Sequence, residues 1–92
     1  MTITHDKDAC TLYLFDEQGH EVGHIMYRIG SGGELRATHT KVFPSFEGKG
    51  YALVLVNALV EYAEQQNLKI VPVCSYVARC FERDPERYSS VM

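Results

Sequence analysis

The segment from Tyr51 to Gln66 constrains the fold more than any other, because almost all of its residues are apolar. Its aliphatic run from Leu53 to Val56 would also suit a buried strand. A helix is favoured because the polar residues recur at i, i+4, i+7 and i+8 and form one narrow stripe: Asn57, Glu61, Glu64 and Gln65. Asn67 fits the position that often ends a helix. A helix with so little polar surface is expected to lie against a sheet over most of its circumference.

Three segments before this helix have the composition and alternation of β-strands: Cys10–Phe15, Glu21–Ile29 and Glu34–Phe43. Between them lie two short stretches of turn-forming residues, Asp16–Gly19 and Gly30–Gly33. Three consecutive strands joined by short turns predict an antiparallel meander.

After the helix, the segment from Leu68 to Tyr76 predicts a short apolar strand that leads directly into a second helix. Ser75 is a good N-cap for a helical stretch over Tyr76–Arg83. Pro72 has no N–H group, so its strand must face an unpaired edge or a gap. A gap beside the Thr38–Phe43 strand would let an extended ligand add its own amide hydrogen bonds.

Ninety-two residues suffice for one hydrophobic core, so residues 1–92 are expected to form a single domain. The predicted fold is α/β, of the α+β kind. It has an antiparallel meander of about three strands, a central helix, a further strand splayed from the third, and a C-terminal helix.

Charge and composition exclude several functional classes. A net charge of −3 gives no basic surface for nucleic acid. Three cysteines without a CxxC pair argue against a disulfide framework or a zinc site, and His20 and His24 have no evident third metal ligand. No segment has the length of a membrane span or the apolar core of a signal peptide. We expect a cytoplasmic protein with reduced thiols, no metal and no membrane partner.

Two short motifs can carry chemistry. Cys74 stands just before the second helix, where peptide dipoles and free N–H groups stabilise thiolate over thiol. The alternative is an inert packed cysteine, since free cysteines are usually buried. Gly48-Lys49-Gly50 opens the first helix with consecutive free amides that suit an anion, although such a sequence is also common in plain flexible loops.

Other candidate residues have a structural and a chemical interpretation. His39 is placed on the strand face of Leu35 and Ala37, as a hydrogen-bonded core histidine or as a base if the gap opens beside it. Tyr76 is either a packed ring or a proton donor to a leaving thiolate. Cys10 and Cys80 are interpreted as structural.

Two stretches of the sequence together form a pattern: Thr38-His39-Thr40-Lys41-Val42-Phe43-Pro44-Ser45-Phe46-Glu47-Gly48-Lys49-Gly50-Tyr51-Ala52 and Pro72-Val73-Cys74-Ser75-Tyr76. This pattern resembles a small single-domain branch of the GCN5-related N-acetyltransferases. The segment Asp84-Pro85-Glu86-Arg87-Tyr88 is similar to the tail motif of that branch, so the resemblance covers nearly the whole chain. It implies a minimal acetyltransferase fold, acetyl-CoA as the cofactor, and an unidentified small-molecule or protein amine as the acceptor.

The resemblance also implies roles for individual residues. The strand Thr40, Lys41, Val42 and Phe43 would pair with the pantetheine arm, and the turn Glu47, Gly48, Lys49, Gly50, Tyr51 and Ala52 would bind the pyrophosphate. Cys74 would lie near the acetyl group as a candidate nucleophile. Glu47 departs from the usual Arg or Gln of this turn and places a carboxylate beside a dianion. The early helices that wall in the acceptor are lacking, so a partner could complete that site.

Three functions follow in order of preference. The first is an acetyl-CoA-dependent acyltransferase, with Cys74, Tyr76 and His39 as candidate catalytic residues. The second is a non-catalytic module or partner subunit that binds CoA or acetyl-CoA. The third is a structural domain without a ligand.

Overall fold

The computed structural model describes residues 1–92 and contains one five-stranded sheet. The strands lie in chain order: β1 (Thr2–Asp6), β2 (Thr11–Phe15), β3 (Glu21–Ile29), β4 (Leu35–Val42) and β5 (Ile70–Pro72). The first four are antiparallel neighbours, and β5 runs parallel to β4. The predicted meander and the splayed further strand are therefore confirmed.

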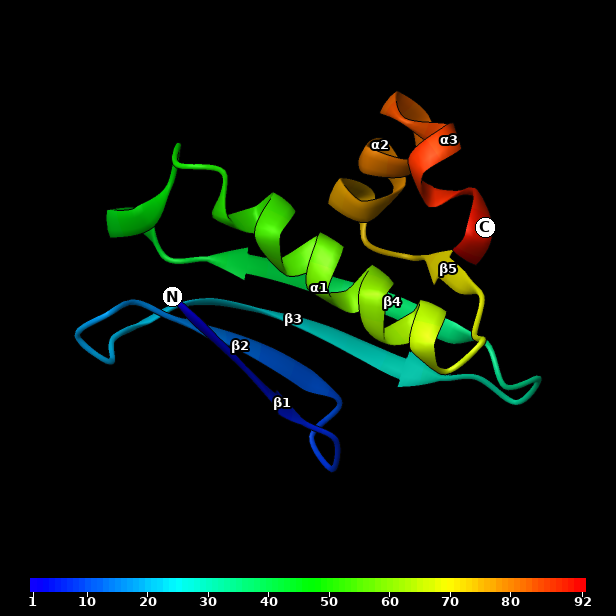
Figure 1. Cartoon of the computed structure of the whole chain (residues 1–92), viewed down its shortest axis with the longest axis horizontal. Helices are drawn as coiled ribbons and strands as arrows, with labels where there is room; N and C mark the ends of the chain where they lie inside the picture. Colours follow the sequence, from blue (N-terminus) through cyan, green and yellow to red (C-terminus); the bar gives the residue numbers. More distant parts are fainter.

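The helices all lie on one side of this sheet (Figure 1). They are α1 (Tyr51–Gln65), α2 (Ser75–Arg83) and the short α3 (Pro85–Tyr88), with 3-10 turns at Pro44–Phe46 and Ser89–Val91. The opposite face of the sheet has no helix over it (Figure 1). None of the helices has both the length and the apolar character needed to cross a membrane.

Strand β1 was not predicted. It pairs with β2 from Thr2–Phe15 to Asp6–Thr11, and a tight turn over residues 7–10 joins the two strands. Only His5 of its five residues is even partly buried, so its side chains carry little of the alternation that reveals a half-buried strand. Cys10, expected inside a strand, lies in that turn at φ 50°, just before β2 begins.

Helix α1 packs one stripe of side chains against the inner face of the sheet: Leu55, Val56, Leu59, Val60 and Ala63 are buried. The expectation that most of its circumference is covered is wrong at its N-terminal end. Leu53 and Val54 are 42% and 43% exposed, because the sheet covers only one side of the helix. Two aliphatic side chains in the first turn of α1 thus remain accessible to a ligand.

A bulge in β4 reverses the expected orientation of His39. Tyr27 pairs with Ala37 and Met26 pairs with His39, so Thr38 is an extra residue between the two pairs. Leu35 and Ala37 are fully buried, but His39 is exposed on the other face of the sheet. The prediction of a core histidine on the Leu35–Ala37 face is therefore wrong, since the period of two that it assumed is broken at Thr38.

Candidate functional site

Strands β4 and β5 pair only over Leu35–Ala37 and Ile70–Pro72 and then separate. The last backbone link between them is the N–H of Cys74, which donates to the carbonyl of Ala37 at 2.8 Å. Beyond that point the chain turns into α2. The edge of β4 that faces away from β3 therefore has no strand beside it from Thr38 to Val42. The predicted gap next to the Pro72 strand is confirmed.

The register of β4 shows which of its amides face the gap. The N–H of Phe43 donates to the carbonyl of Val22 at 3.0 Å, so it points toward β3. Because successive amides of a strand point in opposite directions, Lys41 also points toward β3, whereas Thr40 and Val42 point into the gap. Two of the four residues from Thr40 to Phe43 thus present free amides to an extended ligand.

Cys74 is half-buried at the end of this gap, and its Sγ lies 3.6 Å from Oγ1 of Thr40. Helix α2 begins at Ser75, so Cys74 itself, rather than the predicted Ser75, occupies the N-cap position. The Cys74 side chain accepts no capping hydrogen bond from the amides of α2. These amides therefore act on the sulfur as oriented dipoles. Burial acts to raise the pKa of Cys74, but the amides of Val77 and Tyr76 and the hydroxyl and amide of Thr40 together lower it.

Tyr76 stands two residues after Cys74, in the first turn of α2, and is half-buried. Burial and the neighbouring Cys80 raise the pKa of its phenol, which therefore keeps its proton at neutral pH. Cys80 is only 9% exposed and belongs to the hydrophobic core, as the sequence predicted.

The glycine bend, defined here as residues 47–50, connects the Pro44–Phe46 turn to α1. Gly48 and Gly50 adopt left-handed φ values of 79° and 81°, and Gly50 is the N-cap of α1. The amides of residues 48 to 53 donate to no protein acceptor, and no acidic side chain lies in the first turn of the helix. The bend is thus a set of free donors at the positive end of a 15-residue helix.

The glycine bend and the Cys74 sulfur do not meet in one place. Thr40 lies beside the sulfur, and Phe43 leads into the turn before the bend. The strand from Thr40 to Phe43 rises about 3.3 Å per residue, so it separates the two features by about 10 Å before the turn begins. They lie at the two ends of the stretch of β4 that β5 leaves unpaired.

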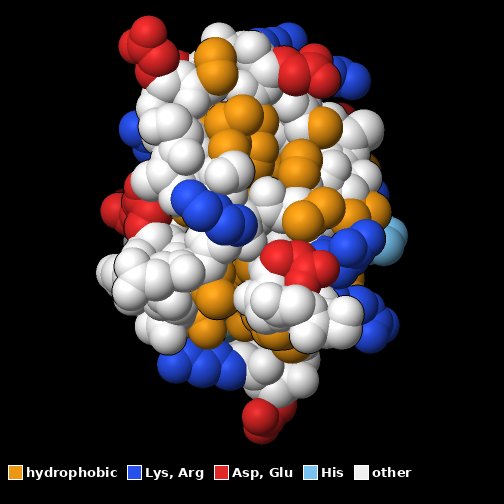
Figure 2. Space-filling model, turned by 90° about the vertical axis from the view of Figure 1, so that its right-hand side faces the viewer, with side chains coloured by type: hydrophobic (Ala, Val, Ile, Leu, Met, Phe, Trp, Pro, Cys, Tyr) orange, Lys and Arg blue, Asp and Glu red, His pale blue; other side chains and the backbone are white.

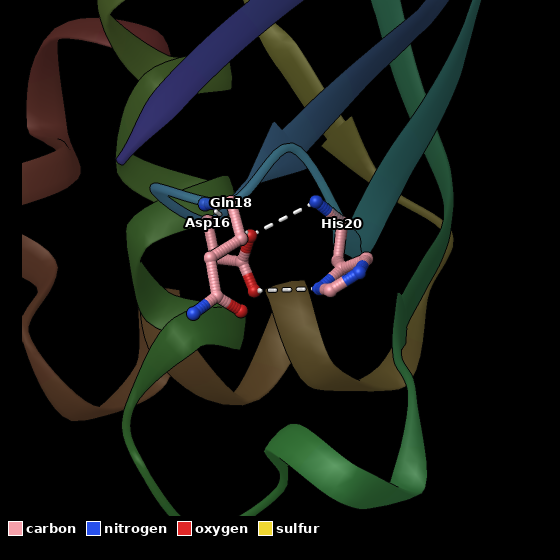
Figure 3. Close-up of polar contacts among 3 residues, drawn as sticks. All are labelled: Asp16, Gln18 and His20. Carbon is pink, nitrogen blue, oxygen red and sulfur yellow. Dashed lines mark hydrogen bonds and ion pairs between the residues drawn. The ribbon is translucent and has the colours of Figure 1, made fainter.

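The other side of the glycine bend carries charges of both signs. Asp16 and Glu17 of the β2–β3 turn line a cavity of about 510 Å³ together with Lys49 and Tyr51. The Asp16 carboxylate accepts N–H bonds of 2.9 Å from both Gln18 and His20 and also meets the His20 ring (Figure 3). These contacts, the His20 amide first, lower the pKa of Asp16 and keep it charged. On this side of the bend, the carboxylates of Asp16 and Glu17 therefore stand beside the positive charge of Lys49.

The two histidines considered as metal ligands are each paired with a carboxylate. His20 lies in the β2–β3 turn rather than in a strand, 3.5 Å from Asp16, and His24 lies 2.8 Å from Glu21. No group of three or more His, Cys, Asp or Glu side chains is placed to hold a metal ion.

Two further cavities flank α2. One of about 380 Å³, between β5, α2 and the C-terminus, is mainly apolar and includes Ile70, Phe81 and Met92. Hydrophobic side chains gather on this side of the molecule (Figure 2). The other, of about 210 Å³, lies between α1 and α2–α3 and includes Asn57, Arg83 and Arg87, which the sequence had not indicated. Their only sequence signal was spacing, since Arg83 and Arg87 are four residues apart.

Comparisons with known proteins agree with this arrangement. A family model described as GCN5-related N-acetyl-transferase matches residues 11–91. The chain is similar to a GCN5-like protein of Staphylococcus aureus, with 29% identity, a TM-score of 0.76, and coverage of 98% of this chain and 85% of that one.

Two more distant structures share the fold. An acetyltransferase of Trypanosoma brucei is 19% identical (TM-score 0.56), with coverage of 84% of this chain and 62% of that one. A ribosomal-protein-alanine N-acetyltransferase of Brucella melitensis is 22% identical (TM-score 0.54), with coverage of 84% and 64%.

Proposed function

Because the chain belongs to the GCN5-related N-acetyltransferase family, we propose that it transfers an acetyl group from acetyl-CoA to an amine. The observation that carries this proposal is the unpaired edge of β4, with free amides at the glycine bend at one end and the half-buried Cys74 sulfur at the other. That arrangement offers separate contacts for the two ends of a long, anionic thioester.

The free donor groups along this edge suit the chemistry of coenzyme A. The amides of residues 48 to 50 and of Tyr51 and Ala52 would bind the diphosphate, each contributing about 0.3–1 kcal/mol when exposed. The gap-facing amides of Thr40 and Val42 would pair with the amide groups of the pantetheine arm. Glu47 is exposed, so its carboxylate remains solvated and weakens this site less than a buried charge would.

Cys74 would act as the nucleophile. Its thiolate would attack the thioester carbonyl, forming a carbon–sulfur bond to Cys74 while the carbon–sulfur bond to CoA breaks. Tyr76 would donate its proton to the departing CoA thiolate, since its raised pKa keeps the phenol protonated at neutral pH, and its phenolate would regain a proton from solvent. The acceptor amine would then take the acetyl group from the cysteine and release its sulfur.

His39 would assist from the opposite face of the sheet. It is exposed next to Thr40, whose own side chain reaches the sulfur on the inner face. An acceptor that approaches the gap from the bare face would therefore pass His39, which would remove a proton from the acceptor's ammonium group so that the neutral amine can attack. Because no helix walls in this face, the acceptor or a partner protein would complete the site (Figure 1).

The acyl-cysteine is tested by incubating the protein with acetyl-CoA, quenching rapidly in acid, and measuring the intact mass. We expect one added acetyl group that is lost in Cys74→Ser and retained in Cys10→Ser, a matched variant of another half-buried free thiol. An acetyl group that persists in Cys74→Ser, or transfer to an amine at the full rate in that variant, rules out the relay. The second result would leave direct transfer from CoA.

A CoA-binding module without catalysis is the second candidate. The carboxylate of Glu47 at the bend and the unwalled acceptor face favour it. Calorimetry that shows CoA binding, combined with no acetylation across a broad panel of amines and protein N-termini, would establish this function instead.

A further inference from the structure

The cavity between α1 and α2–α3 has not been assigned a role above. It has a volume of about 210 Å³, and two arginines, Arg83 at the end of α2 and Arg87 in α3, lie at its border. Asn57 of α1 and Tyr76 of α2 form its walls. Helices far apart in the sequence therefore place two guanidinium groups, the Asn57 amide and the Tyr76 ring around one cavity.

Neither arginine has an anionic side-chain partner. The three ion pairs of the protein are His20–Asp16, His24–Glu21 and Arg36–Glu34, all within the β2–β3–β4 region. Arg87 lies over the Tyr88 ring at 5.5 Å, which restrains its guanidinium without neutralising it. Arginine offers a planar fork of donors that matches the oxygens of a phosphate group.

Asp84 is the one acidic residue at this cavity. Its carboxylate accepts the backbone N–H of Arg87 at 3.4 Å, as the N-cap of α3. With two arginines and one aspartate, the cavity carries a net charge of about +1, and part of the aspartate charge is engaged by the α3 amide. The cavity therefore attracts an anion, whereas the cavity on the other side of the glycine bend holds two carboxylates beside Lys49.

The apolar part of the cavity joins it to the glycine bend. Leu53 lines the cavity and is the third residue of α1, so the cavity begins within about 5 Å of the helix start along its axis. Leu53 is 42% exposed, so its side chain is available to an apolar part of a ligand. A ligand with an apolar ring next to an anionic group would cover this side chain.

These contacts lead to a specific assignment that rests on the proposed function. We infer that Arg83 and Arg87 bind the phosphate monoester on the ribose of coenzyme A, while Leu53 packs against its adenosine. A diphosphate at the bend leaves that nucleoside close to the first turn of α1, where Leu53 lines this cavity. The two arginines thereby distinguish CoA from dephospho-CoA.

Calorimetry with CoA and with dephospho-CoA tests the assignment. We expect the wild-type protein to bind CoA at least about tenfold more tightly, since one hydrogen bond to a charged group contributes about 1.5–3 kcal/mol. Arg83→Gln with Arg87→Gln is expected to bring this ratio close to one, with little change in the affinity for dephospho-CoA. Arg79→Gln is the matched control, because Arg79 is exposed on α2 and lines no cavity.

Asp84→Asn supplies a test in the opposite direction. Asparagine keeps the cap on α3 and removes the negative charge, so the preference for CoA is expected to increase. A ratio near one in the wild-type protein, or a ratio that persists in the double arginine variant, overturns the assignment. If neither nucleotide binds, the proposed function itself fails.

A competition experiment distinguishes CoA from other phosphate monoesters as the ligand of the two arginines. Competition by inorganic phosphate is measured in the wild-type and double-variant proteins. Phosphate binding that depends on the two arginines, together with equal affinities for CoA and dephospho-CoA, also overturns the assignment to CoA, because the phosphate recognised would belong to another molecule.

Discussion

The thiol of Cys74 and the hydroxyl of Thr40 face each other across the gap where β4 and β5 part, with Sγ and Oγ1 3.6 Å apart. The thiol donates to the hydroxyl while it is protonated, and the hydroxyl can donate to sulfur once the proton has left. Thr40 thus connects the strand edge that would bind an extended ligand to the sulfur that would react with it.

Replacing Thr40 by valine is expected to raise the pKa of the Cys74 thiol, because the thiolate loses a donor. At fixed neutral pH the alkylation rate of Cys74 should fall, by up to about tenfold if the lost bond contributes about 1.4 kcal/mol. Peptide mass spectrometry after timed iodoacetamide treatment reports Cys74 separately from Cys10 and Cys80. Thr38→Val, whose lost hydroxyl bonds the Met26 carbonyl, should leave the rate unchanged; equal rates in all three proteins would contradict this role for Thr40.

Gly50→Ala tests the glycine bend. An L-residue in the left-handed conformation costs about 1–2 kcal/mol, so chemical denaturation should show a loss of this size. Gly33→Ala is the matched control, since Gly33 has a φ of 84° in the β3–β4 turn and, like Gly50, has open space around its Cα. Both variants should lose similar stability, but only Gly50→Ala should also weaken CoA binding. An equal effect on affinity in the two variants would remove the bend from the binding site.

The stability of the protein should depend on pH through His5. Its Nε2 lies 2.6 Å from the Tyr27 hydroxyl, and burial, with a smaller contribution from Lys7, lowers the pKa of His5 below its ordinary value. The unfolded chain therefore binds the proton more readily, so stability decreases as pH falls through about 6.5 toward the lower folded-state pKa. The melting temperature of His5→Gln should drop less than that of the wild-type protein over this range. A drop as large as the wild type's would exclude His5, and exposed His20→Gln is the control.

Tyr88→Phe tests how the C-terminal α3 is held on α1. The Tyr88 side chain is 2% exposed, and its hydroxyl donates to Oδ1 of Asn57 at 2.8 Å. Removing this hydroxyl should reduce the free energy of unfolding by about 1 kcal/mol in urea denaturation. Tyr13→Phe removes a hydroxyl without a partner and should have a smaller effect; if its effect is as large, the Tyr88–Asn57 bond is not what anchors α3.

The sequence predicts the regular elements because their patterns are local. The α1 stripe and the limits of β3 follow from periodicity and turn residues, and the gap beside β5 follows from the missing N–H of Pro72. The orientation of His39 cannot be predicted in this way, because the bulge at Thr38 depends on how β4 pairs with β3 and not on composition. Arg83 and Arg87 could not be identified for the same reason, since their neighbours on α1 are about thirty residues away.

A turn of only four residues, Lys7 to Cys10, takes the chain from β1 to β2. No helix covers the face of the sheet opposite α1 (Figure 1), and His39 on it is exposed. An acceptor that approached from this side would therefore meet no enclosing wall, so a folded protein would fit as well as a small metabolite. Selectivity would then depend on how closely the surface of the acceptor matches the open face.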